Sequence, residues 1–348
     1  MSPAVPTSWP WRLRPVVLLA CALLCTAAVA ASPPDASTPE VTNLVPAFLR
    51  FMETARTADP DRRYELWKET YLQPNRHVFE AAILKQAFAD STCRPVVLRS
   101  LDRIFTHYEE HHRAMSDIAT EAPGILRRCA ARLQEEFPDA GVASSPCLLL
   151  VGIGTFNARA DTVDGRDSLV LGAEMFGAAE GLPIVLSHEL FHLYHLDRYR
   201  RAGNAIEERL YFPLLFEGCA VWYSRQANPA SSLRDCLSMG TPAYLGLDLL
   251  PGYEANCARL RPGWAAELLG NLDRAGCDDL YARYFSAAPD AADRPARAGY
   301  ALGYWVVARL VDDGIPLGRI VSAPRAELVA LCRRGLESLA RGSDGGRR

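Results

Sequence analysis

Apolar residues recur at helical spacing through the first part of the chain, from about residue 45 to residue 137. Separations of three, four and seven residues place side chains on one face of a helix, whereas a strand alternates every second residue. We therefore predict a helical N-terminal region over residues 43–140. The positions that define its clearest buried face are Leu98, Leu101, Ile104, Phe105, Tyr108, Met115 and Ile118.

Two short apolar runs then predict strands. Residues 146–151 (PCLLLV) form an uninterrupted apolar stretch, which we expect to continue as one strand through residues 152–157. The dipeptide Asp164-Gly165 indicates a turn. Residues 168–172 (SLVLG) predict a second strand after it.

The helical pattern returns after these strands and reaches the C-terminus. A helix should begin near Gly181 and Pro183, because proline is tolerated in a first helical turn. A second apolar helix is predicted over about residues 213–226. The sequence thus predicts an α+β fold that is mostly helical, with a small sheet beside one helix, in a domain over residues 145–345.

The first thirty residues have the pattern of a secretory signal peptide. Arg12 and Arg14 precede an apolar run over residues 16–31, and residues 28–30 (AVA) offer a cleavage site between small residues. We therefore expect the mature chain to be exported, to the periplasm or the medium, without a stable membrane span.

Two alternatives to a cleaved signal remain open. An uncleaved membrane anchor is one, although the apolar run is short for a membrane span. Lipidation of Cys21 is the other, although the apolar run continues past that cysteine. In each case we expect residues 31–42 to form a linker.

Charge and cysteine content narrow the class of protein. The formal net charge of −3 becomes −5 when Arg12 and Arg14 leave with the signal peptide, so no nucleic-acid partner is expected. Eight cysteines remain, and an even number in an exported protein suggests disulfide bonds, with 105 possible pairings. The most plausible local bridge joins Cys236 to Cys257 across a loop rich in proline and glycine.

Residues 188–192 (HELFH) carry the strongest chemical signal in the sequence. On a helix, His188 and His192 lie on one face, so both imidazoles can reach a single metal ion. Glu189 projects beside them, where it can take a proton from a water molecule. This HExxH arrangement is typical of zinc hydrolases.

A catalytic zinc ion usually has three protein ligands, so a third is needed. His195 lies two turns after His188, about 10 Å along the helix, which is too far for three histidines to close around one ion. We interpret His195 as a pocket-lining or supporting residue. Glu207 and Glu208 lie among polar residues, as is typical of a solvated surface.

Glu217 is the third ligand that we predict. It is the only charged residue in residues 214–223 (LLFEGCAVWY). Burial of a lone carboxylate is costly unless it is paired or bound to a metal ion. Gly218 and Ala220 would let this helix approach the HExxH helix closely. The alternative is a buried carboxylate paired with an arginine.

A second constellation competes with this one. His107 and His111 enclose Glu110 in the inverted pattern HxxEH. The surrounding residues are mostly charged, as on a solvated helix face, whereas active-site helices of this kind are largely buried. We therefore favour the site around Glu189.

HELFH followed by a helix reading FEGCAVWY is similar to the gluzincin group of metallopeptidases, whose third zinc ligand is a glutamate in an E-G-x-A helix. Residues 183–193, 214–224 and 298–310 together also resemble a bacterial family of predicted zinc-dependent proteases of unknown function. The resemblance covers roughly residues 145–312. The spacing from His192 to Glu217 is longer than in the thermolysin type, so no substrate preference is transferred.

The resemblance implies one zinc ion held by His188, His192 and Glu217, with Glu189 as general base and proton shuttle. Gluzincins commonly stabilise the oxyanion with a tyrosine or histidine from a later helix. Tyr300 is the residue that we favour for this role, with Tyr304 lining the pocket; either can equally be an aromatic core residue. In many zinc peptidases the edge of a sheet beside the active helix binds extended substrate by strand addition.

The expected function is zinc-dependent hydrolysis of peptide bonds in a peptide or protein substrate. One alternative is a catalytically degenerate metallopeptidase-like protein that acts in binding or assembly in the cell envelope. Another is a purely structural role for the histidines, with no metal bound.

Overall fold

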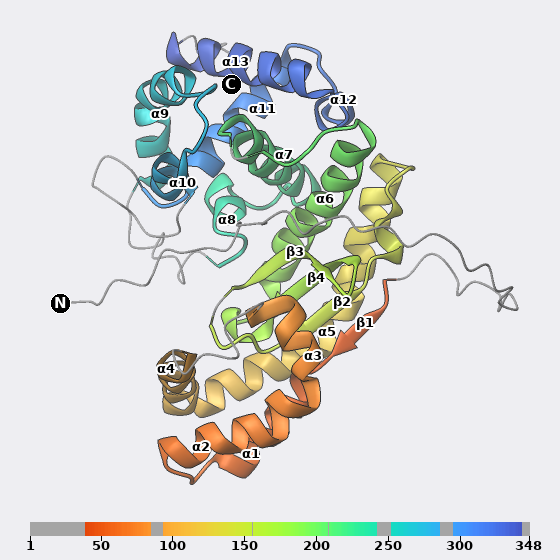
Figure 1. Ribbon diagram of the computed structural model, residues 1–348, viewed down its shortest axis with the longest axis vertical. Coiled ribbons are helices and arrows are strands. Elements are labelled where there is room, and N and C mark those ends of the chain that lie inside the picture. Colours follow the sequence, from red (N-terminus) through yellow and green to blue (C-terminus); the bar gives the residue numbers. More distant parts are fainter. Residues whose placement is uncertain are drawn as a thin grey trace, which may run out of the picture. The chain divides into compact units, whose positions relative to one another are not determined.

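The protein has a four-stranded sheet, with one group of helices between its first and second strands in the sequence and another group after its last strand (Figure 1). The computed structural model describes residues 39–84, 93–154, 156–207, 209–241, 252–285 and 295–342, which all belong to one compact unit. The predicted mostly helical α+β class is confirmed. The signal peptide predicted over residues 1–30 lies outside the described residues.

Three strands of the sheet are parallel and the fourth is antiparallel. The strands are β1 (Val41–Asn43), β2 (Cys147–Leu150), β3 (Ala158–Val163) and β4 (Arg166–Gly172). Their order is β1-β2-β4-β3, with β3 antiparallel to β4, so β3 lies at an edge of the sheet. The central strand β2 is buried along its whole length, as its uninterrupted apolar run requires.

β3 and β4 form a hairpin around the dipeptide Asp164-Gly165. These two residues have φ angles of 51° and 75°. Two consecutive residues with positive φ are typical of a type I′ turn, whose twist matches that of the flanking strands. The predicted turn and the strand after it are therefore confirmed.

The single strand predicted over residues 146–157 is wrong. After β2 the chain turns through Ile153 and Gly154, which have φ angles of 58° and 71°, and a separate strand, β3, follows. The backbone N–H groups of Gly152 and Gly154 donate to the buried carboxylate of Glu174, at 3.1 and 2.6 Å. Glu174, which follows β4, thus holds residues 152–154 in a loop where the apolar pattern predicts a strand.

The helices predicted for the N-terminal region are present, and in the sequence they lie between β1 and β2. They are α1 (Val45–Ala55), α2 (Pro60–Trp67), α3 (Arg76–Val78), α4 (Cys93–Thr106) and α5 (Tyr108–Glu136). Asp59 begins α2, because its side chain accepts a hydrogen bond from the backbone N–H of Arg62 at 2.9 Å and Pro60 follows it.

The chain before α1 also belongs to the sheet. We expect a linker over residues 31–42, but Val41 lies in β1 and pairs with Cys147 of β2. A three-residue strand is too short to show a pattern in the sequence. The apolar core is continuous from Val45 in α1 to Leu339 near the C-terminus. The N-terminal helices therefore share one core with the rest of the described chain.

The helices after the sheet include the two that carry the predicted site. The helices are α6 (Leu182–Arg201), α7 (Tyr211–Ala227), α8 (Leu233–Leu237), α9 (Tyr253–Gly270), α10 (Asp278–Phe285), α11 (Ala298–Asp312), α12 (Leu317–Val321) and α13 (Arg325–Ala340). α6 begins where Pro183 predicts, and α7 spans the predicted apolar helix.

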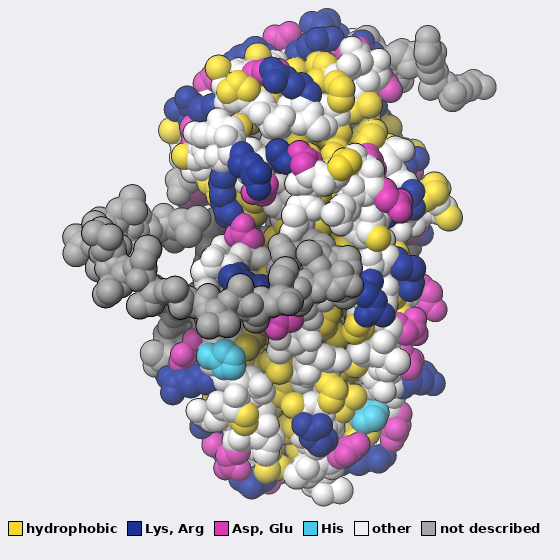
Figure 2. All heavy atoms as spheres, turned by 90° about the vertical axis from the view of Figure 1, so that its right-hand side faces the viewer, with side chains coloured by type: hydrophobic (Ala, Val, Ile, Leu, Met, Phe, Trp, Pro, Cys, Tyr) yellow, Lys and Arg dark blue, Asp and Glu magenta, His cyan; other side chains and the backbone are white. Residues whose placement is uncertain are grey.

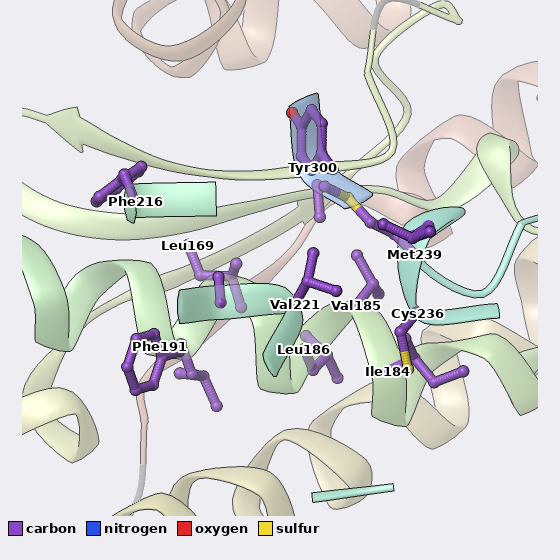
Figure 3. Close-up of a cluster of buried hydrophobic side chains, with 14 of the residues drawn as sticks. Leu169, Ile184, Val185, Leu186, Phe191, Phe216, Val221, Cys236, Met239 and Tyr300 are labelled. Atoms are coloured by element: carbon purple, nitrogen blue, oxygen red, sulfur yellow. The ribbon is translucent and has the colours of Figure 1, made fainter. Parts of the chain in front are cut away.

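α7 packs against both α6 and α11. Figure 3 shows the apolar contact with α6, where Val185 and Leu186 lie beside Val221 of α7. The contact with α11 is closer, since a Cβ added to Gly218 would lie 2.4 Å from the carbonyl group of Gly303. The expectation that Gly218 opens onto α6 is therefore wrong: this glycine lets α7 touch α11.

The predicted disulfide bond between Cys236 and Cys257 is not formed. Both are buried, and none of the seven cysteines whose side chains the structure describes forms a disulfide bond. The thiol of Cys236 faces Ser224 in α7, whereas that of Cys257 faces Tyr253 in its own helix.

Charges of both signs share the surface. Figure 2 shows Lys and Arg side chains interspersed with Asp and Glu on one face of the molecule. Exposed ion pairs include Arg200 with Asp167 and Arg319 with Glu327. Among the described helices, none is both long and apolar enough to cross a membrane.

Candidate metal centre

Two histidines and two glutamates meet where α6 passes α7 and the edge strand β3. α6 is buried on all sides through its centre, because its residues are apolar nearly all round and α5, α7 and the sheet cover it. The exposed fractions of His188, Glu189 and His192 are 0%, 2% and 4%. Three polar side chains this deeply buried require a compensating interaction.

The two histidines and Glu217 converge on one point. The rings of His188 and His192 have centroids 4.5 Å apart. Oε2 of Glu217 lies 3.3 Å from Nε2 of His188 and 3.2 Å from Nε2 of His192. Ligand atoms placed about 2.0 Å from a tetrahedral zinc ion are separated by about 3.3 Å. The spacing therefore fits a donor set of two nitrogens and one oxygen.

The hydrogen bonding of His188 supports this fit. Its Nε2 atom, although close to Glu217, has no hydrogen bond of acceptable geometry among the described residues. A buried ring nitrogen that points at a shared centre, and not along a hydrogen bond, is the arrangement expected of a metal ligand.

Either glutamate could join the histidines by distance alone. One ligand atom each from His188, Glu189 and His192 also lies within 4.8 Å of the others. Glu217 fits the position of a third ligand more closely, because its oxygen is within 3.3 Å of both Nε2 atoms. Glu189 is held instead by the backbone of β3, as described below.

The charges of the cluster compensate one another in the metal-free protein. Burial alone would raise the pKa of Glu217, but the charge of His192 and the contacts with both imidazoles outweigh it, so the pKa lies well below its usual value. Burial lowers the pKa of His192, and attraction to Glu217 raises it on balance. Burial and the neighbouring His192 lower the pKa of His188 to about 4. Glu217 is thus kept ionised, as a metal ligand must be.

Glu189 lies beside the three ligands. Its Oε2 atom accepts a hydrogen bond from the backbone N–H of Ala160 in β3, at 2.9 Å. Burial raises the pKa of Glu189 to about 7, while His192 and Glu217 act in opposite directions. A carboxylate with a pKa near neutrality is suited to act as a general base.

Aromatic rings fix the orientation of the two imidazoles. Phe216 stacks on His192 with centroids 4.0 Å apart, and Tyr300 stacks on His188 at 6.4 Å. The Nδ1 atoms of both histidines lack a hydrogen-bond partner among the described residues. Ring stacking therefore orients these imidazoles, as a hydrogen bond to Nδ1 does in many metal sites.

Tyr300 and Tyr304 differ in their position. Tyr300 is 3% exposed and lies against His188, and burial raises its pKa well above 10, so its hydroxyl keeps its proton. The hydroxyl of Tyr304 accepts a hydrogen bond from Arg225 at 2.6 Å. Of the two tyrosines, the structure brings Tyr300 to the ligands.

His195 lies behind the site. Its ring is 2% exposed and contacts Phe216, with centroids 5.1 Å apart, and Phe191, at 6.1 Å. Burial and the charge of His192 lower its pKa to about 3, so it is a neutral, buried histidine.

The competing motif does not form a site. α4 ends at Thr106 and α5 begins at Tyr108, so His107 stands at the N-cap of α5 with a non-helical backbone, and not inside the helix that carries Glu110 and His111. His107 and Glu110 are exposed, and the ring centroids of His107 and His111 are 6.5 Å apart.

No family model, curated protein or solved structure matches this chain.

Three contributors to the site have no clear signal in the sequence. Phe216 reads as one more apolar residue of α7, and the N–H of Ala160 belongs to the main chain. Arg297 begins α11 with a φ of 59°, is 9% exposed and lies over the ring of Tyr300 at 4.9 Å. Its guanidinium donates to the carbonyl of Leu237 at 3.0 Å, which ties α11 to α8 beside the site.

Proposed function

We propose that this chain is a zinc-dependent peptidase, in which His188, His192 and Glu217 hold one zinc ion and Glu189 is the general base. The observation that carries the proposal is the position of Glu217, whose Oε2 lies within 3.3 Å of both Nε2 atoms. Residues from two helices would not bring two nitrogens and a carboxylate to that spacing for packing alone, since each must be desolvated.

A zinc ion bound there supplies Lewis acidity, which lowers the pKa of water to about 7 and polarises a carbonyl group. The protein supplies the proton transfers. Glu189 accepts the proton of the attacking water and passes it to the leaving amine nitrogen, a role for which its raised pKa is suited. Tyr300 remains protonated and donates a hydrogen bond to the developing oxyanion.

The proposed substrate is an extended peptide. β3 lies at an edge of the sheet and contacts α6, so a peptide added to that edge would pass the metal ligands. The predicted signal peptide supports a proposed location outside the cytoplasm, in the periplasm or the medium.

The test compares the purified mature chain with Glu189→Ala. We expect stoichiometric zinc in both proteins by elemental analysis. Turnover of labelled casein, an unfolded protein, should fall at least about 100-fold in the variant, because the general base is lost. Equal turnover in the two proteins would rule out the mechanism.

The same experiment separates the alternatives. A degenerate binding protein would hold zinc and cleave nothing. A purely structural cluster would hold no zinc. The convergence of three ligands with Glu189 beside them favours the peptidase, because a binding protein would not need a base at that position.

A further inference from the structure

The edge of β3 that faces away from β4 carries backbone N–H and C=O groups that are not used in the sheet. In a two-residue hairpin the residues that flank the turn, here Val163 and Arg166, form a hydrogen-bonded pair, and such pairs alternate with pairs that are not bonded. The alternation directs every second N–H and C=O of β3 away from β4. The outward-facing residues are Ala158, Ala160 and Thr162.

All three outward N–H groups already have an acceptor. The side chains of Asn157 and Asp161 each accept from the N–H of the next residue, at 2.8 Å. These two bonds are local, since each joins two consecutive residues of the chain. The N–H of Ala160 differs, because its acceptor is Glu189 in α6, at 2.9 Å.

A peptide added to the edge of β3 would compete with Glu189 for the N–H of Ala160. An extended peptide that pairs with the edge of β3 must accept hydrogen bonds from outward N–H groups with its own carbonyls. Ala160 offers the N–H nearest to the proposed general base. That N–H cannot serve the peptide and Glu189 fully at the same time.

We propose that the hydrogen bond between Ala160 and Glu189 is a latch on the general base, which an extended peptide opens when its carbonyl takes the N–H of Ala160. Glu189 then turns its released oxygen to water. This inference rests on the proposed function, since it concerns how the same site is switched on. With such a latch, Glu189 is released from Ala160 to act as a base only when substrate is bound.

The latch predicts that Glu189 competes with the peptide for one donor. Glu189→Ala and Glu189→Gln both remove the base, so the zinc-loaded variants can bind unfolded substrate without cleaving it. Glutamine retains an oxygen that can accept from Ala160, whereas alanine leaves the N–H free. We expect fluorescein-labelled casein to bind Glu189→Ala about fivefold more tightly than Glu189→Gln in fluorescence anisotropy, the value of one net hydrogen bond.

Two proline variants test whether the donor is Ala160. Ala160→Pro removes this N–H at a strand edge, where proline is tolerated. In that background Glu189→Ala and Glu189→Gln should bind equally. Thr162→Pro removes a neighbouring outward N–H whose acceptor is Asp161, and it should preserve the fivefold difference.

Hydrogen exchange gives a reading that needs no proline variant. The amide of Ala160 should exchange several-fold faster in zinc-loaded Glu189→Ala than in Glu189→Gln, because only the second retains an acceptor.

The outcomes separate the latch from the proposed function. If the wild type contains zinc and cleaves casein, but the two Glu189 variants show equal affinity and equal exchange at Ala160, the latch is overturned and the peptidase stands. If the wild type lacks zinc or turnover, the proposed function fails and the latch fails with it.

Discussion

In the proposed site, Glu217 is the residue that turns a histidine pair into a three-ligand centre, because its ionised oxygen lies within 3.3 Å of both Nε2 atoms. We expect Glu217→Gln to weaken zinc binding by more than about 100-fold, since even the loss of an outer hydrogen-bond partner costs about 10- to 100-fold. Competition with a chromophoric chelator measures the affinity.

The control for this variant is Glu207→Gln. Glu207 is one of the two other glutamates considered from the sequence, and it pairs with Arg209 and Arg325. Its substitution should leave zinc affinity within about twofold. A similar loss in both variants would show that Glu217 is not a ligand.

Glu174, which is not one of the proposed metal ligands, should make the free energy of unfolding depend on pH. Burial raises its pKa to about 7 from a value of 4.5, although the N–H groups of Gly152 and Gly154 act against the rise. The folded protein therefore holds this proton more tightly than the unfolded chain. The stabilisation is complete below pH 4.5 and is lost as the pH rises through about 7.

The test compares wild type with Glu174→Gln in urea unfolding at pH 5 and pH 8. Between these values the free energy of unfolding of the wild type should fall by up to about 3 kcal/mol relative to the variant, and contributions from the shared metal site cancel. Glu180→Gln, at an exposed position, is the control. Parallel pH profiles for wild type and Glu174→Gln would contradict the prediction.

At the scale of elements, the contact between α7 and α11 places Glu217. A Cβ on Gly218 would lie 2.4 Å from the backbone of Gly303, so the two helices touch through their main chains next to the ligand. Gly218→Ala must push α7 away from α11. We expect it to lower the free energy of unfolding by about 2–3 kcal/mol and to weaken zinc binding, measured by urea unfolding and metal titration.

Gly263→Ala is the matched control for that variant. Gly263 also lies in a helix, but an added Cβ there meets no atom within 4 Å. Alanine should stabilise that helix by up to about 1 kcal/mol and leave zinc affinity unchanged. Equal effects at the two glycines would mean that the close approach of α7 and α11 is not needed.

These elements also show what sequence reasoning can reach. The start of α6 and the isolation of Glu217 in α7 could be predicted, because proline position and a lone charge in an apolar run are local signals. β3 could not, because the apolar residues that alternate in its sequence ARADTV are alanines, which are uncommon in strands and give a weak signal.

Other features depend on tertiary pairing. Gly218 shows in the sequence that α7 approaches something closely, but not that its partner is α11. The bond from Ala160 to Glu189 involves a main-chain N–H, for which no residue type gives a signal. Cys236 and Cys257 have a plausible spacing for a bridge, yet each thiol faces a different neighbour.

At the scale of the whole molecule, the N-terminal helices support the site directly. Arg132 of α5 donates to the carbonyl of Ala227 at the end of α7, at 2.6 Å. The thiol of Cys129 in the same helix donates to the carbonyl of Pro183 at the start of α6, at 3.8 Å. α5 is therefore hydrogen-bonded to both helices that carry the proposed ligands. The geometry of the proposed metal centre thus depends on the N-terminal helices as well as on α6 and α7.

Metal binding should in turn stabilise the whole fold. His188 and His192 stand in α6 and Glu217 follows 25 residues after His192 in α7, so only the folded state presents all three. A ligand that binds the folded state alone adds about 4 kcal/mol when its free concentration is 1,000 times the dissociation constant. In a protein of this size we expect zinc to raise Tm by roughly 5–15 °C over the chelator-treated protein in calorimetry. The shift should fall to about a third or less in Glu217→Gln, whose zinc binding is weakened more than about 100-fold, but persist in Glu207→Gln; an unchanged Tm for the wild type, or an equal shift in Glu217→Gln, would mean that zinc does not bind at these three residues.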